Sequence, residues 1–400
     1  MKSLNRRNSK AEQASRLPCA VGAAPISPLR GQGRRDACPT LRFVESHRDS
    51  GIAHWGHEPN RVGRERRALP PLFMGALLLG AVLLNPCRLW ADSTDAIAEE
   101  KPTVIVVVGA AGDDEYGQNF AKWAGLWEKT SREAGAKYIT IGLKDAAATN
   151  DLAQLQKTLA DEPTNAPGEL WLVLLGHGTF DGKEARFNLR GPDLTATNLA
   201  LLLKPFTRPV AVINAFSSSG PFLHPLSAPA RVVITATRSG NEQNYARFGQ
   251  YFSEAIADPQ ADLDKDGQTS LLEAWLTASY RVAEFYKSEG RLATEHALLD
   301  DNGDGLGTPP DWFRGVRAVK KAKDGATLDG PRAHQFHLVR SEAERRMPAA
   351  VRARRDQLEL AVAKLREAKE ELPETEYYQK LEPLLLELAR LYDQLGPKSK

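Results

Sequence analysis

The strongest constraint on the fold of this chain is a series of short, β-branched, almost wholly apolar segments that alternate with helical ones. The first is TVIVVV at residues 103–108, and such runs are typical of strands buried on both faces of a parallel sheet. Similar patterns predict further strands at residues 138–143, 170–175, 210–213 and 231–236. Helical spacing predicts helices between them, at about 117–134, 151–160 and 194–203. The alternation predicts an α/β fold with a doubly wound, mostly parallel sheet, whose sites lie beyond the carboxyl ends of the strands.

The charge of the chain is unevenly distributed along its 400 residues, which are enough for one large or two ordinary domains. Residues 1–91 carry 15 Lys and Arg against 6 Asp and Glu, whereas residues 92–400 carry 38 against 45. Nonspecific binding of nucleic acid needs clustered Lys and Arg to neutralise phosphate. We therefore exclude a DNA-binding role for the acidic body, and no nucleic-acid partner is expected.

An apolar run at residues 72–84 follows an arginine cluster and leads to a small residue, Ala91. Its 13 residues fit an export signal, since a stable membrane span needs about 20 apolar residues. We predict a signal peptide at 66–91 and a periplasmic or secreted mature protein; the alternative is a membrane anchor that is retained. The Arg- and Pro-rich residues 1–65 are interpreted as an over-extended start or a disordered leader.

Two predicted strands end in residues with catalytic chemistry. The strand at 170–175 leads to Gly176, His177 and Gly178, which present an imidazole suited to proton transfer. The next strand along the chain leads to a turn of small residues, Asn214-Ala215-Phe216-Ser217-Ser218-Ser219-Gly220.

This arrangement, with Asp193 between the two strand ends, resembles the caspase-like cysteine peptidases, a group that includes metacaspases and legumain. The resemblance spans residues 103–255. In that family one strand ends in the His-Gly of the general base, a short hairpin and a helix follow, and the next strand ends at the nucleophilic cysteine. The resemblance implies that His177 is the base. The cysteine position falls on Phe216 or on Ser217, depending on the direction of alignment, because this chain has one residue more than the family motif.

No thiol is available for that chemistry, since the last cysteine of the chain is Cys87. A serine hydroxyl in place of a thiol needs stronger activation by its base. We therefore predict a noncatalytic peptidase homologue that acts by binding a peptide or protein partner, and the rival hypothesis is a hydrolase that uses Ser217 and His177. The resemblance also places Arg238 and Glu242 in the specificity-pocket region, where they line a cleft or pair with one another.

Residues 262–273 show the spacing of an EF-hand calcium loop. Oxygen-bearing side chains stand at positions 1, 3, 5, 9 and 12, a glycine at position 6 and a backbone carbonyl at position 7, which together satisfy the six to eight oxygens that Ca²⁺ needs. Helices are predicted on both sides, at 248–257 and 271–287. The alternative is an Asp-Gly turn that caps a helix. The predicted ligands are Asp262, Asp264, Asp266, Gln268, Ser270 and Glu273.

A second loop at residues 300–311 repeats this spacing with an aspartate in place of the glutamate at position 12. The shorter carboxylate and two prolines weaken its closure around a metal ion. Its predicted ligands are Asp300, Asn302, Asp304, Leu306 and Asp311, and Ca²⁺ is the only cofactor that the sequence predicts.

The last part of the chain has two apolar stripes at helical spacing, with Pro373 between them. The pattern predicts a helical hairpin at 335–396, which either caps its own domain or offers a coiled-coil seam to a partner. The predicted organisation is completed by a caspase-like α/β domain at 102–257 and a calcium-loop region at 258–315.

Overall fold

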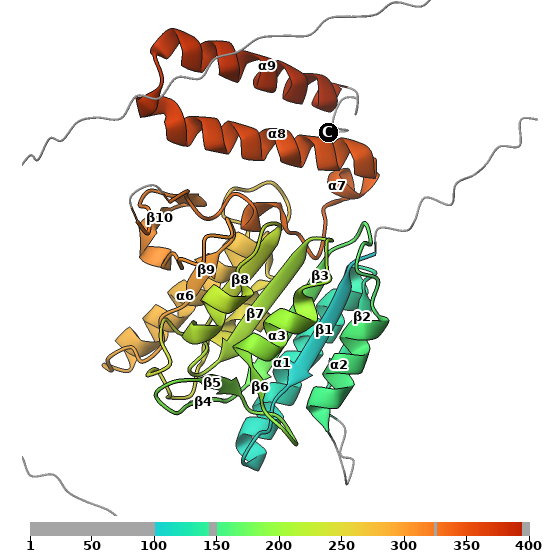
Figure 1. The fold of residues 1–400 in the computed structure, drawn as a ribbon, viewed down its shortest axis with the longest axis vertical. Coiled ribbons are helices and arrows are strands. Elements are labelled where there is room, and N and C mark those ends of the chain that lie inside the picture. The colour runs from blue at the N-terminus through green and yellow to red at the C-terminus, as the bar shows by residue number, and fades with distance from the viewer. Residues whose placement is uncertain (1–100, 144–149, 324–325, 394–400) are drawn as a thin grey trace, which may run out of the picture. The chain divides into compact units, whose positions relative to one another are not determined.

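A computed structural model describes residues 101–143, 150–323 and 326–393 of the chain (Figure 1). The predicted leader at 1–65, the predicted signal peptide at 66–91 and all three cysteines lie outside the described residues. Among the helices of the described part, none is long and apolar enough to cross a bilayer.

A six-stranded sheet lies at the centre of the fold, with the strand order β2-β1-β3-β7-β8-β9. Its strands are β1 (Thr103–Val108), β2 (Lys137–Ile141), β3 (Leu170–Gly176), β7 (Val210–Phe216), β8 (Arg231–Thr235) and β9 (Leu298–Asp300). Neighbours from β2 to β8 are parallel, and β9 runs antiparallel to β8. The predicted α/β fold with a mostly parallel sheet is confirmed.

Helices cover both faces of the sheet, because alternate strand residues point to opposite sides (Figure 1). Val104 and Val106 belong to one buried cluster and Ile105 and Val107 to another. The first cluster includes residues of α1 (Asp114–Glu133), α5 (Phe248–Ala255) and α6 (Leu271–Ser288). The second includes residues of α2 (Asp151–Asp161), α3 (Ala196–Leu203) and α4 (Leu223–Leu226).

Side-chain caps fix where several of these helices begin. Asp113 accepts a hydrogen bond from the third amide of α1, Asn150 does the same for α2, and Thr195 for α3. Each cap satisfies an amide that has no partner within the helix. In α1 the Asp113 cap sets the start at Asp114, three residues before the predicted start at 117.

The strands differ from the predicted ones at their carboxyl ends. β7 continues three residues beyond the predicted end, because Asn214 to Phe216 stay in register with Leu174 to Gly176. The side-chain amide of Asn214 donates to the Ile234 carbonyl of the neighbouring strand. A small antiparallel sheet, β4-β5-β6, is formed by the residues between β3 and α3 along the chain. Its last strand consists of the first two residues of the predicted helix at 194–203, which therefore begins later than predicted. Its strands are β4 (Gly178–Phe180), β5 (Ala185–Phe187) and β6 (Leu194–Thr195).

The C-terminal part consists mainly of helices that follow a short hairpin of β10 (Phe313–Arg314) and β11 (Arg317–Ala318). These helices are η4 (Ala333–Gln335), α7 (Glu342–Arg346), α8 (Ala349–Glu367), η5 (Ala368–Glu371) and α9 (Glu374–Asp393). α8 and α9 lie side by side in Figure 1, and the Arg354 guanidinium of α8 donates to both carboxylate oxygens of Glu387 in α9, at 2.7 and 2.9 Å.

Candidate functional sites

The parallel pairing of β3 with β7 brings the two predicted catalytic strand ends together. Gly176 is the register partner of Phe216, so His177 and Ser217 follow the paired strands at the same edge of the sheet. The glycine after the histidine packs closely on this turn: a Cβ at Gly178 would lie 2.1 Å from the Ser217 carbonyl oxygen. Glycine is therefore required there by close approach of two backbones.

The hydroxyl of Ser217 is fully engaged with backbone groups. It donates to the Gly178 carbonyl and accepts from the Gly178 amide, both at 3.1 Å, and the residue is only 2% exposed. Both the proton and a lone pair of the hydroxyl are thereby used by β4. The arrangement fixes the turn to the β4-β5 hairpin.

The His177 ring lies among aromatic side chains. Its centroid is 4.6 Å from the Tyr116 ring and 5.1 Å from the Phe120 ring, both edge to face, and 5.9 Å from the Tyr245 ring. Burial lowers the pKa of His177, while a backbone hydrogen bond at Ala111 opposes the shift. The imidazole is therefore mainly neutral near pH 7.

The rest of the turn after β7 is held by the core and by the end of β8. Phe216, the other candidate for the cysteine position, is buried between the rings of Phe187 and Phe222. Ser218 has a positive φ of 60° and donates its amide to the Glu242 carbonyl. The Ser219 hydroxyl accepts the Ala236 and Thr237 amides. These residues position the turn, and Phe216 at the cysteine position is a core side chain without a nucleophilic group.

Glu242 is the centre of a small charged group beside this turn. Its carboxylate accepts from the Arg238 amide, and its Oε1 lies 3.2 Å from the Arg238 Nε, so the two residues pair as one of the two predictions states. The same Oε1 lies 2.6 Å from Nδ1 of His296. The sequence analysis missed His296, which lies 54 residues from its partner. Asp193 caps its own loop by accepting the Leu189 amide.

The loop at 262–273 has its carboxylates turned inward by its own backbone. Asp262 accepts the amides of Lys265 and Gly267, Asp264 accepts that of Asp266, and Asp266 accepts that of Gln268. Carboxylate oxygens of the three aspartates lie within 4.8 Å of one another. The helices α5 and α6 flank this loop, and the short helix η2 (Pro259–Ala261) lies between α5 and the loop along the chain.

The last predicted ligands of this loop form the cap of α6. Ser270 accepts the Glu273 amide, and the Glu273 carboxylate accepts the amide and the hydroxyl of Ser270. The other Glu273 oxygen accepts the amides of Leu263 and Asp264, at 2.7 and 3.2 Å. Glu273 is thus a buried carboxylate that already points at the loop, and the predicted helix cap and the predicted ligand are the same side chain.

The loop at 300–311 repeats the backbone geometry of the first one over positions 1 to 7. Asp300 accepts the amides of Gly303 and Gly305, Asn302 accepts that of Asp304, and Asp304 accepts that of Leu306. Positions 4 and 6 have positive φ in both loops, at 63° and 91° in the first and 82° and 74° in the second. The two loops therefore share one conformation despite different flanks, since β9 precedes the second.

The end of the second loop differs from that of the first. Asp311 at position 12 is exposed and lies in η3 (Pro310–Trp312). Two further buried carboxyl groups, which the sequence analysis missed, hold the loop to the chain around residue 330. Asp301 accepts the amides of Gly330 and Ala333, and Asp329 accepts the Asp301 amide. Burial, with the Asp301 charge beside it, raises the pKa of Asp329 to about 9.

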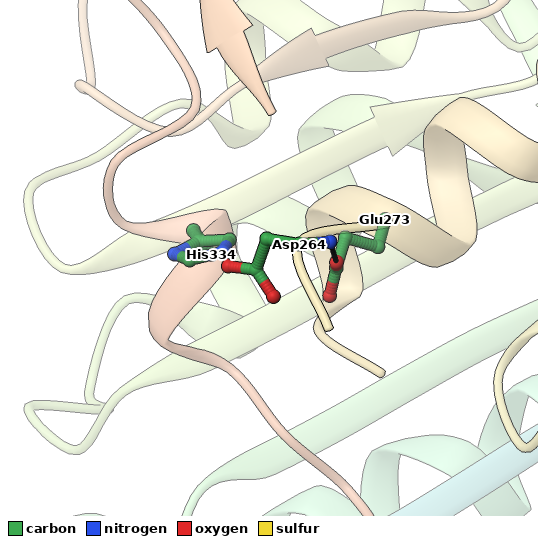
Figure 2. Close-up of side chains that lie close together, drawn as sticks. All are labelled: Asp264, Glu273 and His334. Atoms are coloured by element: carbon green, nitrogen blue, oxygen red, sulfur yellow. Dashed lines mark hydrogen bonds and ion pairs between the residues drawn. The ribbon is translucent and has the colours of Figure 1, made fainter. Parts of the chain in front are cut away.

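An imidazole from a distant segment contacts the first loop. His334 of η4 lies 70 residues from Asp264, and its Nε2 is 3.0 Å from the Asp264 carboxylate. Figure 2 shows Asp264 between the His334 ring and the Glu273 carboxylate, and ligand atoms of these three side chains lie within 4.8 Å of one another. No sequence spacing links His334 to the loop, so only the fold reveals it.

The chain matches no known family model and no curated protein sequence. Among solved structures it is similar to the Drosophila initiator caspase Dronc, with 13% identity and a TM-score of 0.36, over 52% of this chain and 81% of that one. It is also similar to caspase-1 from Spodoptera frugiperda, with 12% identity and a TM-score of 0.35, over 51% of this chain and 88% of that one.

Proposed function

We propose that this chain is a calcium-binding, caspase-like peptidase homologue that has no peptidase activity and acts by binding a peptide or protein partner. The observation that carries the calcium part is the shared set of four amide-to-side-chain hydrogen bonds in the two loops. Such bonds orient one oxygen after another toward a single point, as a Ca²⁺ loop requires.

The residues of the first loop fit a calcium ion. Asp262, Asp264 and Asp266 supply converging carboxylates, and Gln268 supplies the backbone carbonyl at position 7. Glu273 lies beneath them at the start of α6, where it would close the site after giving up its hydrogen bonds to the Leu263 and Asp264 amides. In the second loop Asp300, Asn302, Asp304 and the Leu306 carbonyl would supply the ligands, with Asp311 at position 12.

The caspase-like part of the proposal rests on the order of elements around His177. A strand that ends in His-Gly, the β4-β5 hairpin, the helix α3 and a neighbouring parallel strand follow one another as the resemblance implies. The noncatalytic part rests on Ser217, whose buried hydroxyl is bonded twice to Gly178. Its proton is donated to the Gly178 carbonyl and not to a general base, as nucleophilic attack would need.

The calcium role is tested by thermal unfolding of the full chain with Ca²⁺ and with a chelator. Binding to the folded state alone stabilises it by about 2.7 kcal/mol at a hundredfold excess over Kd, so chelation is expected to lower Tm. Asp266→Asn keeps the oxygen that accepts the Gln268 amide but removes a charge from the first loop. This variant is expected to bind Ca²⁺ more weakly, with little change in Tm when Ca²⁺ is absent.

The matched control is Asp304→Asn, which makes the same change at position 5 of the second loop. The difference between the two variants assigns the stabilisation to one loop or the other. Glu273→Gln is a poorer test taken alone, because its carboxylate also caps α6. If Asp266→Asn, Asp304→Asn and the parent show the same Tm change on chelation, the loops are structural turns only and the calcium proposal is wrong.

The absence of catalysis is tested with a peptide library in the presence of Ca²⁺ and with a serine-reactive probe. The parent is expected to show no cleavage that Ser217→Ala or His177→Ala removes, and no covalent label on Ser217. Cleavage by the parent that is lost in both variants would establish the rival hydrolase, in which the Ser217 hydroxyl leaves Gly178 and bonds to the His177 ring.

A further inference from the structure

The first calcium loop is open to a nitrogen ligand as well as to oxygen ligands. His334 reaches it from η4, and its Nε2 lies 3.0 Å from an Asp264 oxygen. The ring is one-third exposed, and so is the Asp264 side chain, so neither group is sealed inside the core. A metal ion therefore has access to both groups without unfolding of the loop.

The position of His334 is fixed by contacts with both loops. Asp301 of the second loop accepts the Gly330 and Ala333 amides at the start of η4, at 2.9 and 2.7 Å. After η4, the Phe336 carbonyl accepts the Leu271 amide of α6 at 2.8 Å. The histidine is thus held on both sides, and the imidazole is presented to Asp264 by the fold rather than by a mobile tail.

We propose that Asp264, Glu273 and His334 form a mixed nitrogen-and-oxygen site for a divalent transition metal of the Zn²⁺ or Mn²⁺ class. The proposal rests on the metal-binding role proposed above for the first loop. Ligand atoms of the three side chains lie within 4.8 Å of one another, which a small inward movement converts to a coordination shell (Figure 2). Imidazole nitrogen suits Zn²⁺ and carboxylate oxygen suits Mn²⁺ and Ca²⁺, and a site with both kinds of ligand accepts the borderline ions.

A second, buried histidine, His337, lies next to His334. His337 is 7% exposed, and its Nε2 has no hydrogen-bond partner among the described residues. Its ring centroid is 6.4 Å from that of His334. An unpaired ring nitrogen in a buried position costs free energy, but His337 is not one of the three clustered ligands.

The geometry makes the two kinds of metal competitors. Asp264 belongs both to the oxygen group with Asp262 and Asp266 and to the mixed group with Glu273 and His334. Two cations that share this carboxylate would repel each other, so the binding of one disfavours the binding of the other. An excess of Ca²⁺ is therefore expected to raise the apparent Kd for Zn²⁺.

The experiment measures Zn²⁺ and Ca²⁺ affinities of the full chain by calorimetry, for the parent, His334→Ala and His296→Ala. The control is matched, because His296 also bonds to a single carboxylate, Glu242, at 2.6 Å. Among the described residues, His296 does not belong to a group of three or more possible metal ligands. Pulsed EPR of bound Mn²⁺ reports directly whether an imidazole nitrogen is a ligand.

We expect the Zn²⁺ affinity to fall at least about tenfold in His334→Ala, to stay unchanged in His296→Ala, and the nitrogen coupling to Mn²⁺ to disappear only in the former. The Ca²⁺ affinity is expected to be little affected. Unchanged Zn²⁺ affinity in His334→Ala, or Mn²⁺ without nitrogen coupling in the parent, would overturn this inference and leave the calcium proposal intact. Zn²⁺ binding through His334 without any Ca²⁺ binding would overturn the calcium proposal and support this inference. Binding of neither metal would overturn both proposals.

Discussion

At the scale of single residues, the buried His337 makes stability depend on acidity. Burial lowers its pKa from 6.5 to about 4, so the unfolded chain binds a proton between pH 6.5 and pH 4 that the folded chain does not. The free energy of unfolding is therefore expected to fall as the pH drops through this window. The loss that this side chain contributes is about 3 kcal/mol by pH 4.

The measurement is urea unfolding of the parent and of His337→Leu between pH 7.5 and pH 4. The variant is expected to lose less stability than the parent over that range, because it has no ring to protonate. His224→Leu serves as the control: it removes an exposed histidine and keeps the buried His337. Its stability is expected to depend on pH as that of the parent does. Parallel pH curves for the parent and His337→Leu would contradict the prediction.

At the scale of elements, two adjacent arginines of α8 form ion pairs that differ mainly in burial. Arg354 binds Glu387 of α9 with both side chains about 40–47% exposed, whereas Arg355 binds Glu344 of α7 with both at or below 10%. Loss of one partner from a buried pair leaves an uncompensated charge, while an exposed pair is screened by water. Arg355→Met is expected to destabilise the chain by about 3 kcal/mol, and Arg354→Met is expected to have a much smaller effect.

Chemical denaturation of the two variants checks this difference. Arg352 remains 3.2 Å from Glu344 in the Arg355 variant, which keeps the expected loss at the lower end of the range for buried pairs. A similar loss for both arginines would mean that α7 is not anchored to α8 through Glu344.

The strand predictions from periodicity were confirmed for the most apolar segments and wrong in length or absent for the others. The apolar runs at 103–108, 170–175 and 231–236 are strands within one residue of the predicted ends, since burial on both faces leaves little else for such segments to form. The predicted strand at 210–213 ends too early, because polar Asn214 interrupts the apolar pattern but not the hydrogen bonding. The three-residue β9 is too short to carry any pattern.

At the scale of the whole molecule, the expected route of the chain can be tested. An export signal at 66–91 predicts that the mature protein begins near Asp92, because the small residue Ala91 ends the segment after the apolar run. N-terminal sequencing of the protein recovered from the periplasmic or secreted fraction measures this start. Recovery of intact residues 1–65 from native cells would contradict the over-extended start, and a membrane-bound product would favour the retained anchor.

Local patterns along the chain were enough to predict the α/β class and the two acidic loops. Alternation of apolar strands with helices is a local pattern that burial imposes directly on residue types. The spacing of Asp262, Asp264 and Asp266 is likewise local, because one short turn brings these carboxylates together. Both inferences needed no knowledge of contacts between distant segments.

Tertiary structure decided what the side chains at those places contact. The pairing of β3 with β7 put the Ser217 hydroxyl on Gly178 rather than on the His177 ring, and the docking of η4 on α6 brought His334 to Asp264. Partners 39 and 70 residues apart have no periodicity to reveal them. Their meeting depends on how the elements pack, which is set by the summed burial of the whole core and not by any one segment.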